Sequence, residues 1–196
     1  MSNTTRPSTR GRRNTRAGAF FEKQLRDTFT TLETWGICAM SKAPTPLKII
    51  SRAEEGVFRA RIIVSGQPDF YGVLRGGRAV VIEAKHTGTA QMPTSRLLEH
   101  QAEALRRHAE LGALTLVAVS FGSLRIGLIP WSEWCNLKAI LGRKYVTFED
   151  LEPHGWAVEN MPAKLGLRLQ QLAELPAEDM RPLCVPPLAQ QTMQAA

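Results

Sequence analysis

Hydrophobic positions in the first part of the chain repeat at helical spacing. Apolar residues at i, i+4, i+8 and i+11 within residues 17–35 form one stripe on a helix, and Gly36 follows as a residue type that ends helices. The pattern predicts a helix over 17–35 that packs one face against the rest of the domain. The stripe consists of Phe21, Leu25, Phe29 and Leu32.

Shorter apolar stretches after this helix predict strands, with further helical segments between them. The apolar run at 113–120 suits a buried strand, and a helical pattern that ends at Gly112 precedes it. Strands and helices in this arrangement predict an α/β domain with a mixed central sheet flanked by helices. The other predicted strands are 37–41, 47–50, 57–64, 79–84 and 124–129, and later helices follow Pro130 and cover 164–175.

The net positive charge of the chain indicates a polyanionic partner. The 196 residues include 25 Lys and Arg against 18 Asp and Glu, a net charge of +7 that suits nucleic acid. No apolar run is long enough to span a membrane, the N-terminus lacks the apolar core of a secretory signal, and the three cysteines are scattered. We therefore expect a cytoplasmic, nucleoid-associated protein of a bacterium or a phage-infected cell.

The two ends of the chain differ in composition from its middle. Residues 1–16 contain arginines and no acid, which predicts a flexible basic arm that contacts phosphates without reading bases. Residues 17–150 are predicted to form the main domain, and 151–196 a C-terminal extension of unknown role. The arginines of the arm assigned to DNA are Arg10, Arg12, Arg13 and Arg16.

Two predicted strands joined at Gly76-Gly77 carry the candidate chemistry. Asp69 begins the first strand, and Glu83 and Lys85 share one face of the second, about 6–7 Å apart between their Cα atoms. Two carboxylates can hold Mg²⁺, with Mn²⁺ as an alternative, and an adjacent amine can neutralise charge on phosphate oxygens. The arrangement predicts metal-assisted hydrolysis of a phosphodiester.

The turn between these strands must be irregular for that chemistry. A strict two-residue turn at Gly76-Gly77 would pair Asp69 with Ala84, so that Asp69 would face away from Glu83. A three- or five-residue loop, or a β-bulge, restores the facing. The proposed chemistry therefore predicts one of these irregularities.

Several short motifs resemble those of a known nuclease family. Pro68-Asp69 with the E-A-K of 83–85 resembles the PD-(D/E)-x-K nuclease signature. Four segments in the family's order narrow the resemblance to RecU-type Holliday junction resolvases, which implies a restriction-endonuclease-like nuclease fold. These segments are 18–22 (G-x-x-F-E), 42–46 (K-x-P-T-P), 83–87 (E-A-K-x-T) and 100–101 (H-Q).

The resemblance also implies roles for further residues. Gln101, a polar amide on an apolar helix face, would give an oxygen to the metal, and Glu22 would lie close to it as a supporting catalytic residue. Where the family has a Thr two residues before the Asp, this chain has Gln67, whose longer side chain can also coordinate. The predicted catalytic residues are Asp69, Glu83, Lys85 and Glu22, and the predicted metal ligands are Asp69, Glu83, Gln101 and Gln67.

In RecU-type resolvases a protruding β-hairpin stalk enters the centre of a four-way junction, and residues 47–66 are in the corresponding position. The stalk predicted here is short. The basic side chains that could line it are Lys48, Arg52, Arg59 and Arg61.

The function that the resemblance implies is a Mg²⁺-dependent endonuclease that resolves four-way junctions in DNA recombination and repair. Symmetric cutting of two strands needs two active sites, which predicts a homodimer with two-fold symmetry. Alternatives are another nuclease of the same superfamily acting on flaps, duplex ends or specific sites, a junction-binding protein without catalysis, and a structural protein whose basic charge is incidental.

Overall fold

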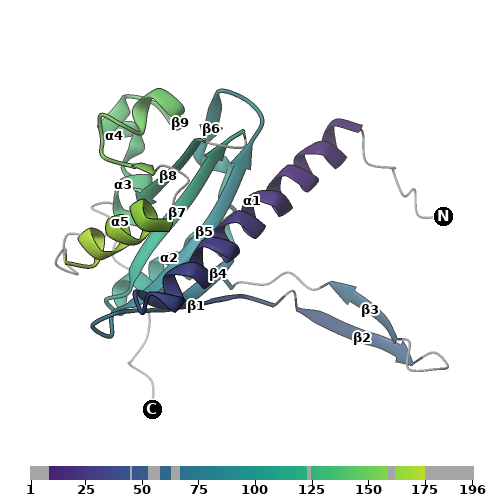
Figure 1. The fold of residues 1–196 in the computed structure, drawn as a ribbon. Coiled ribbons are helices and arrows are strands. Elements are labelled where there is room, and N and C mark those ends of the chain that lie inside the picture. The colour runs from purple at the N-terminus through teal and green to yellow at the C-terminus, as the bar shows by residue number, and fades with distance from the viewer. Residues whose placement is uncertain are drawn as a thin grey trace, which may run out of the picture.

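The computed structural model describes residues 9–44, 46–52, 58–62, 67–122, 125–158 and 162–174. Its centre is a six-stranded sheet in the order β1-β4-β5-β7-β8-β10 (Figure 1). β5 and β7 run parallel and the other neighbours antiparallel, so the sheet is mixed. The strands are β1 (Cys38–Lys42), β4 (Phe70–Leu74), β5 (Ala79–Thr87), β7 (Leu114–Phe121), β8 (Arg125–Pro130) and β10 (Ala157–Val158).

Helices cover both faces of this sheet. Along β5, Val80 and Ile82 belong to one apolar core with α1 (Thr9–Thr34) and α5 (Pro162–Glu174), whereas Val81 belongs to a second core with α2 (Glu99–Glu110). The short helices α3 (Trp131–Cys135) and α4 (Leu137–Leu141) complete the second core. The predicted α/β architecture with a flanked, mixed sheet is confirmed, and so is the alternation of faces along β5.

Two small sheets lie outside the central one. β2 (Leu47–Arg52) and β3 (Phe58–Ile62) form an antiparallel ribbon that projects from the body, as predicted for the stalk (Figure 1). β6 (Gln91–Pro93) pairs with β9 (Tyr145–Thr147). Each of these two short strands is followed by one 3₁₀ turn, η2 (Thr94–Arg96) after β6 and η3 (Phe148–Asp150) after β9.

The first helix confirms the predicted stripe and begins earlier than predicted. All four stripe residues are buried, and Gly36 follows the helix with φ +64°. However, α1 starts at Thr9, so the prediction of a flexible arm is wrong for residues 9–16. Arginine is a strong helix former, and extending a packed helix requires no new nucleation. Residues 1–8 lie outside the described chain.

Residues 151–174 belong to the same fold, so the domain boundary predicted at 150 is wrong. β10 pairs with β8 at the edge of the central sheet. α5, which confirms the predicted helix at 164–175, buries Leu165, Leu169 and Leu172 in the core that α1 also fills. A two-residue strand has no periodicity to detect, so the pairing of β10 with β8 has no local signature in the sequence. Within the described residues, no helix has the length and apolarity needed to cross a bilayer.

Candidate active site

The β4–β5 hairpin has the register that the proposed chemistry requires. The backbone N–H of Leu74 donates to Arg78 O at 2.9 Å, which leaves residues 75–77 as a three-residue loop. Both loop glycines have positive φ, 95° and 89°, which glycine adopts without steric cost. Continuing the strand register by one residue places Asp69 opposite Glu83. The predicted irregular turn is therefore confirmed.

Asp69 directly precedes β4 and is held by two hydrogen bonds, one to its side chain and one to its backbone. Its carboxylate accepts a hydrogen bond from the backbone N–H of Ala84 at 2.8 Å, and its carbonyl oxygen accepts one from the N–H of Ala43, also at 2.8 Å. Burial raises the pKa of Asp69, and the hydrogen bond from Ala84 offsets part of that effect. The carboxylate is thus preorganised in a half-buried position between β1 and β5.

Glu83 is the most unusual side chain of the sheet, because it is charged and only 1% exposed. Its Oε1 accepts hydrogen bonds from Lys85 Nζ at 2.8 Å and from the Gln101 side-chain amide. Its Oε2 is buried and has no hydrogen-bond donor among the described residues. Burial, followed by the nearby charge of Asp69, raises the pKa of Glu83 to about 7. A buried carboxylate oxygen without a donor is costly, and a proton shared with Asp69 or a bound cation relieves that cost.

Lys85 and Gln101 form hydrogen bonds with Glu83 and with each other. The Lys85 side chain is 13% exposed, and its Nζ donates to Glu83 and, at 2.8 Å, to Gln101 Oε1. The same Gln101 oxygen accepts the backbone N–H of Leu98 at 3.1 Å, which caps the start of α2. Gln101 therefore positions Glu83 and Lys85, and its side chain must shift to offer its oxygen to a cation.

Glu22 on α1 lies close to Asp69. Its charge raises the pKa of Asp69, and its Oε2 forms an ion pair with Lys42 Nζ at 2.6 Å. Lys42, the last residue of β1, was not predicted as a site residue, although the K-x-P-T-P segment that it begins had singled it out. The cluster thus contains three acids, Glu22, Asp69 and Glu83, and two lysines, Lys42 and Lys85, so its net charge attracts a cation.

The fit to a divalent metal follows from this donor set. Asp69 and Glu83 would supply hard oxygen ligands, and the buried Glu83 Oε2 has no hydrogen-bond donor among the described residues that would compete with a cation. Across the described chain, no group of three or more His, Cys, Asp and Glu side chains could hold a metal. A metal here would need further oxygens from water or phosphate, which suits Mg²⁺, a cation that keeps several waters.

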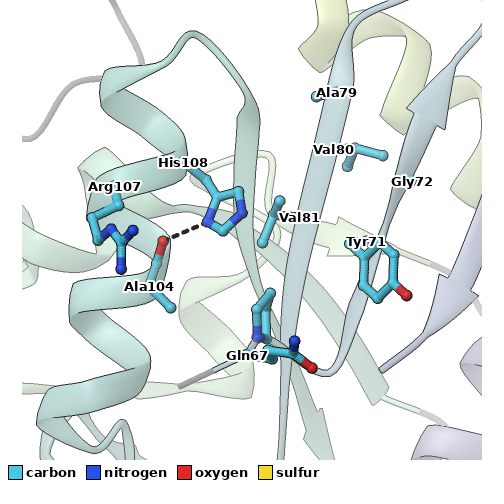
Figure 2. A pocket seen from close by; sticks show the side chains of 10 residues that line it. Gln67, Tyr71, Gly72, Ala79, Val80, Val81, Ala104, Arg107 and His108 are labelled. Atoms are coloured by element: carbon cyan, nitrogen blue, oxygen red, sulfur yellow. Dashed lines mark hydrogen bonds between the residues drawn. The ribbon is translucent and has the colours of Figure 1, made fainter. Parts of the chain in front are cut away.

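Gln67 lies at the margin of this cluster. It is exposed and lines a pocket of about 480 Å³ that lies between β4 and α2 (Figure 2). Its assignment as a metal ligand stays a prediction.

The basic residues predicted to contact DNA lie on two separate elements. On the stalk, Lys48 is directly opposite Arg61, and Arg59 lies two residues before Arg61 on the same face; all three are exposed. On α1, Arg16 is exposed. The side chains of the remaining predicted contacts, Arg10, Arg12, Arg13 and Arg52, lie outside the described structure.

Comparison with solved structures finds a resemblance to one described as the structure of Archaeoglobus fulgidus Hjc, a Holliday junction resolvase from an archaeal hyperthermophile. The TM-score is 0.43 and the sequence identity 18%, over 70% of this chain and 93% of that one.

Curated relatives share more sequence with the chain. Proteins named Holliday junction resolvase RecU are 28% identical over 150 residues in Streptococcus gordonii (72% of this chain and 74% of the relative), and 30% identical over 149 residues in Bacillus pumilus (70% and 71%). A third, from Listeria monocytogenes, is 27% identical over 180 residues (86% and 85%). Residues 16–171 match the RecU family, described as Recombination protein U, so the match extends beyond residue 150 into α5. The chain therefore belongs to the RecU family.

Proposed function

We propose that this protein is a Mg²⁺-dependent endonuclease that cuts four-way DNA junctions. The observation that carries the proposal is the buried Glu83 opposite the half-buried Asp69 and beside Lys85, with a carboxylate oxygen of Glu83 that no donor satisfies among the described residues. Protein stability alone does not favour such a pair. The curated relatives named Holliday junction resolvase RecU support a four-way junction as the substrate.

Each residue of the site has a distinct task in this proposal. Asp69 and Glu83 would hold the metal, which would supply polarisation of the scissile phosphate and a lower pKa for a bound water. Lys85 presents its ammonium group to the charge that develops on the phosphate oxygens. Gln101 positions Glu83 and Lys85 through one hydrogen bond to each side chain, and its bond from the Leu98 N–H fixes Gln101 itself. Glu22 adds negative charge next to Asp69.

The stalk is proposed to contact the phosphates of the junction. Lys48 and Arg61 are direct cross-strand neighbours, and like charges in that position repel each other in the free protein. Phosphate groups relieve this repulsion, and Arg59 extends the same basic face. The arm arginines, and Arg52 of the stalk, stay assigned to phosphate contacts with the DNA backbone.

The opposite face of the stalk supports a homodimer. Leu47, Ile49 and Phe58 lie on it and are 58%, 59% and 46% exposed. Exposed apolar side chains gathered on one face are typical of an interaction surface. A second copy that covers them would place two active sites around one junction, and two sites are what symmetric cutting requires.

The direct test compares DNA substrates. Labelled four-way junction, flap and linear duplex are incubated with the protein in Mg²⁺ or in EDTA. We expect paired nicks in the junction, in Mg²⁺ alone. Equal cutting of all three substrates would leave a nuclease without junction selectivity, and tight junction binding without cutting would indicate a non-catalytic binding protein.

A further inference from the structure

The pocket between β4 and α2 is a direct continuation of the candidate active site. Tyr71 and Val81 line it and are register partners on β4 and β5. Each is two residues from one of the acids, on the same face, which corresponds to about 7 Å along a strand. α2 forms the third wall, and its pocket residue Ala104 lies one helical turn beyond the site residue Gln101. The pairs of site residue and pocket residue are therefore Asp69 and Tyr71 at β4, Glu83 and Val81 on β5, and Gln101 and Ala104 on α2.

The lining of this pocket combines an aromatic ring with an apolar floor and a polar rim. Figure 2 shows the Tyr71 ring of β4 and the His108 ring of α2 on opposite sides, with Val81 between them and Gln67 at one end. Tyr71 is 43% exposed, so a large part of the side chain is accessible. Arg107, which is exposed, adds a positive charge to the lining.

His108 presents a defined hydrogen-bonding edge. Its Nδ1 lies 2.7 Å from the carbonyl oxygen of Ala104, and because a carbonyl only accepts, Nδ1 carries the proton and donates (Figure 2). In the neutral ring Nε2 is then a bare acceptor. A ligand with N–H groups on the edge of a flat apolar ring would complement this lining.

A nucleobase is a flat ring with N–H groups on its edge. The distance between the pocket and the acids indicates which nucleotide of the substrate would supply that base. Two residues along a strand, about 7 Å, separate the pocket from the acids, so the pocket lies beside the position of the scissile phosphate. At about 480 Å³, the pocket has the size of small-ligand sites and cannot admit a duplex. We propose that it binds the base of the nucleotide next to the scissile phosphate, with Tyr71 as the stacking platform.

This proposal rests on the proposed function and deepens it, because it provides a reason for branch selectivity. A base inside a continuous duplex is stacked on both faces, and extracting it costs a few kcal/mol. At a branch point the stack is interrupted, so the base enters the pocket at lower cost. The pocket thus favours cutting at the point where strands exchange. The metal site by itself would not distinguish that point from a continuous duplex.

The test combines a protein change with a substrate change. Tyr71→Ala is assayed on a four-way junction and on junctions that lack one base on either side of the cut. We expect the variant to cut the intact junction about tenfold more slowly than wild type, the loss typical of one base–aromatic stack. Removing the recognised base should slow wild type similarly and should not slow the variant further. Tyr71→Phe should recover most of the loss.

A matched control is available on the same strand. Val73 lies two residues further along β4, is 40% exposed, and is outside the pocket lining, so Val73→Ala should cut at the wild-type rate. Unchanged cutting by Tyr71→Ala would overturn the pocket assignment and leave the proposed function intact. An equal loss on every substrate, abasic ones included, would also overturn it, because that result indicates a structural role. Absence of junction cutting by wild type would overturn the proposed function itself.

Discussion

The two faces of β4 differ more than those of any other strand near the site. Phe70 and Leu74, which point toward α1 and α5, are 1% and 3% exposed, whereas Tyr71 and Val73 on the other face are 43% and 40% exposed. The reason is coverage, because α2 packs against β5 and β7 on the second face and does not extend over β4. One face of this strand stabilises the fold, and the other is open.

The acids lie at the boundary between these two environments. Glu83 is on the α2 face of β5, at the place where the helix cover ends, and Asp69 is opposite it at the beginning of β4. Fully open solvent would leave the carboxylates with ordinary pKa values, and complete cover would exclude a phosphate. Among the described residues, α2 leaves β4 uncovered on this face, and in the proposed function this opening would admit DNA to a partly desolvated site.

The largest expected effect is on catalysis. Asp69→Asn and Glu83→Gln should each reduce junction cutting by about 10⁴-fold or more, as removal of one member of a catalytic set does. Junction binding should persist, because the basic face of the stalk is unchanged. Gel-based cleavage and mobility-shift assays measure the two properties separately. Normal cutting by either variant contradicts the assignment of that acid.

The next effect compares two neighbouring residues of β4. Leu74→Ala should lower the free energy of unfolding by about 2–5 kcal/mol, because it leaves a cavity in the core with α1 and α5. Val73→Ala removes a partly exposed side chain and should change it by less than about 1 kcal/mol. Urea denaturation of the two variants is the measurement, and equal losses would show that both faces are covered in solution.

A pH effect follows from Glu83, whose pKa rises from its ordinary 4.5 to about 7 on folding. The folded chain therefore holds this proton more tightly than the unfolded chain does. The stabilisation is fully present below about pH 4.5 and is lost as pH rises through about 7, a difference of up to about 3 kcal/mol. Urea midpoints in EDTA, measured for wild type and Glu83→Gln between pH 5 and 8, isolate this contribution. Wild type should lose stability relative to the variant, and parallel curves would contradict the raised pKa.

The smallest effect concerns the stalk. Replacing Lys48 and Arg61 with alanine should weaken junction binding by a few-fold and lower the slope of log K against log salt by about one for each lost phosphate contact. Stability should rise slightly, because two facing like charges are removed. An unchanged salt slope would remove these residues from the DNA interface.

Much of this arrangement could be predicted from local sequence. The stripe on α1 and the alternation along β5 follow from side-chain periodicity. The irregular β4–β5 turn follows only from the proposed chemistry, which leaves a three-residue loop, a five-residue loop and a β-bulge open; the structure has the three-residue loop. The order of the sheet and the role of β10 could not be predicted, because strand pairing between distant segments has no local signature.

The site shows the same limit. Glu83 and Lys85 share a strand face, so their proximity followed from the sequence. The pairing of Lys42 with Glu22, and the three hydrogen bonds of Gln101, depend on how β1, α1 and α2 meet in space. Within the part of the chain that the structure describes, the pocket beyond Asp69 lies where α2 does not cover β4, an arrangement that no stretch of residues encodes by itself.

The central claim is that one divalent cation binds between Asp69 and Glu83, and calorimetric titration with Mn²⁺ tests it without any DNA. At pH 6 the account predicts saturable binding of one ion per chain with proton release, since the pKa of Glu83 is about 7 and its proton must leave when the cation enters. Both the binding and the proton release should disappear in Asp69→Asn. Equal Mn²⁺ binding by wild type and that variant would contradict the account.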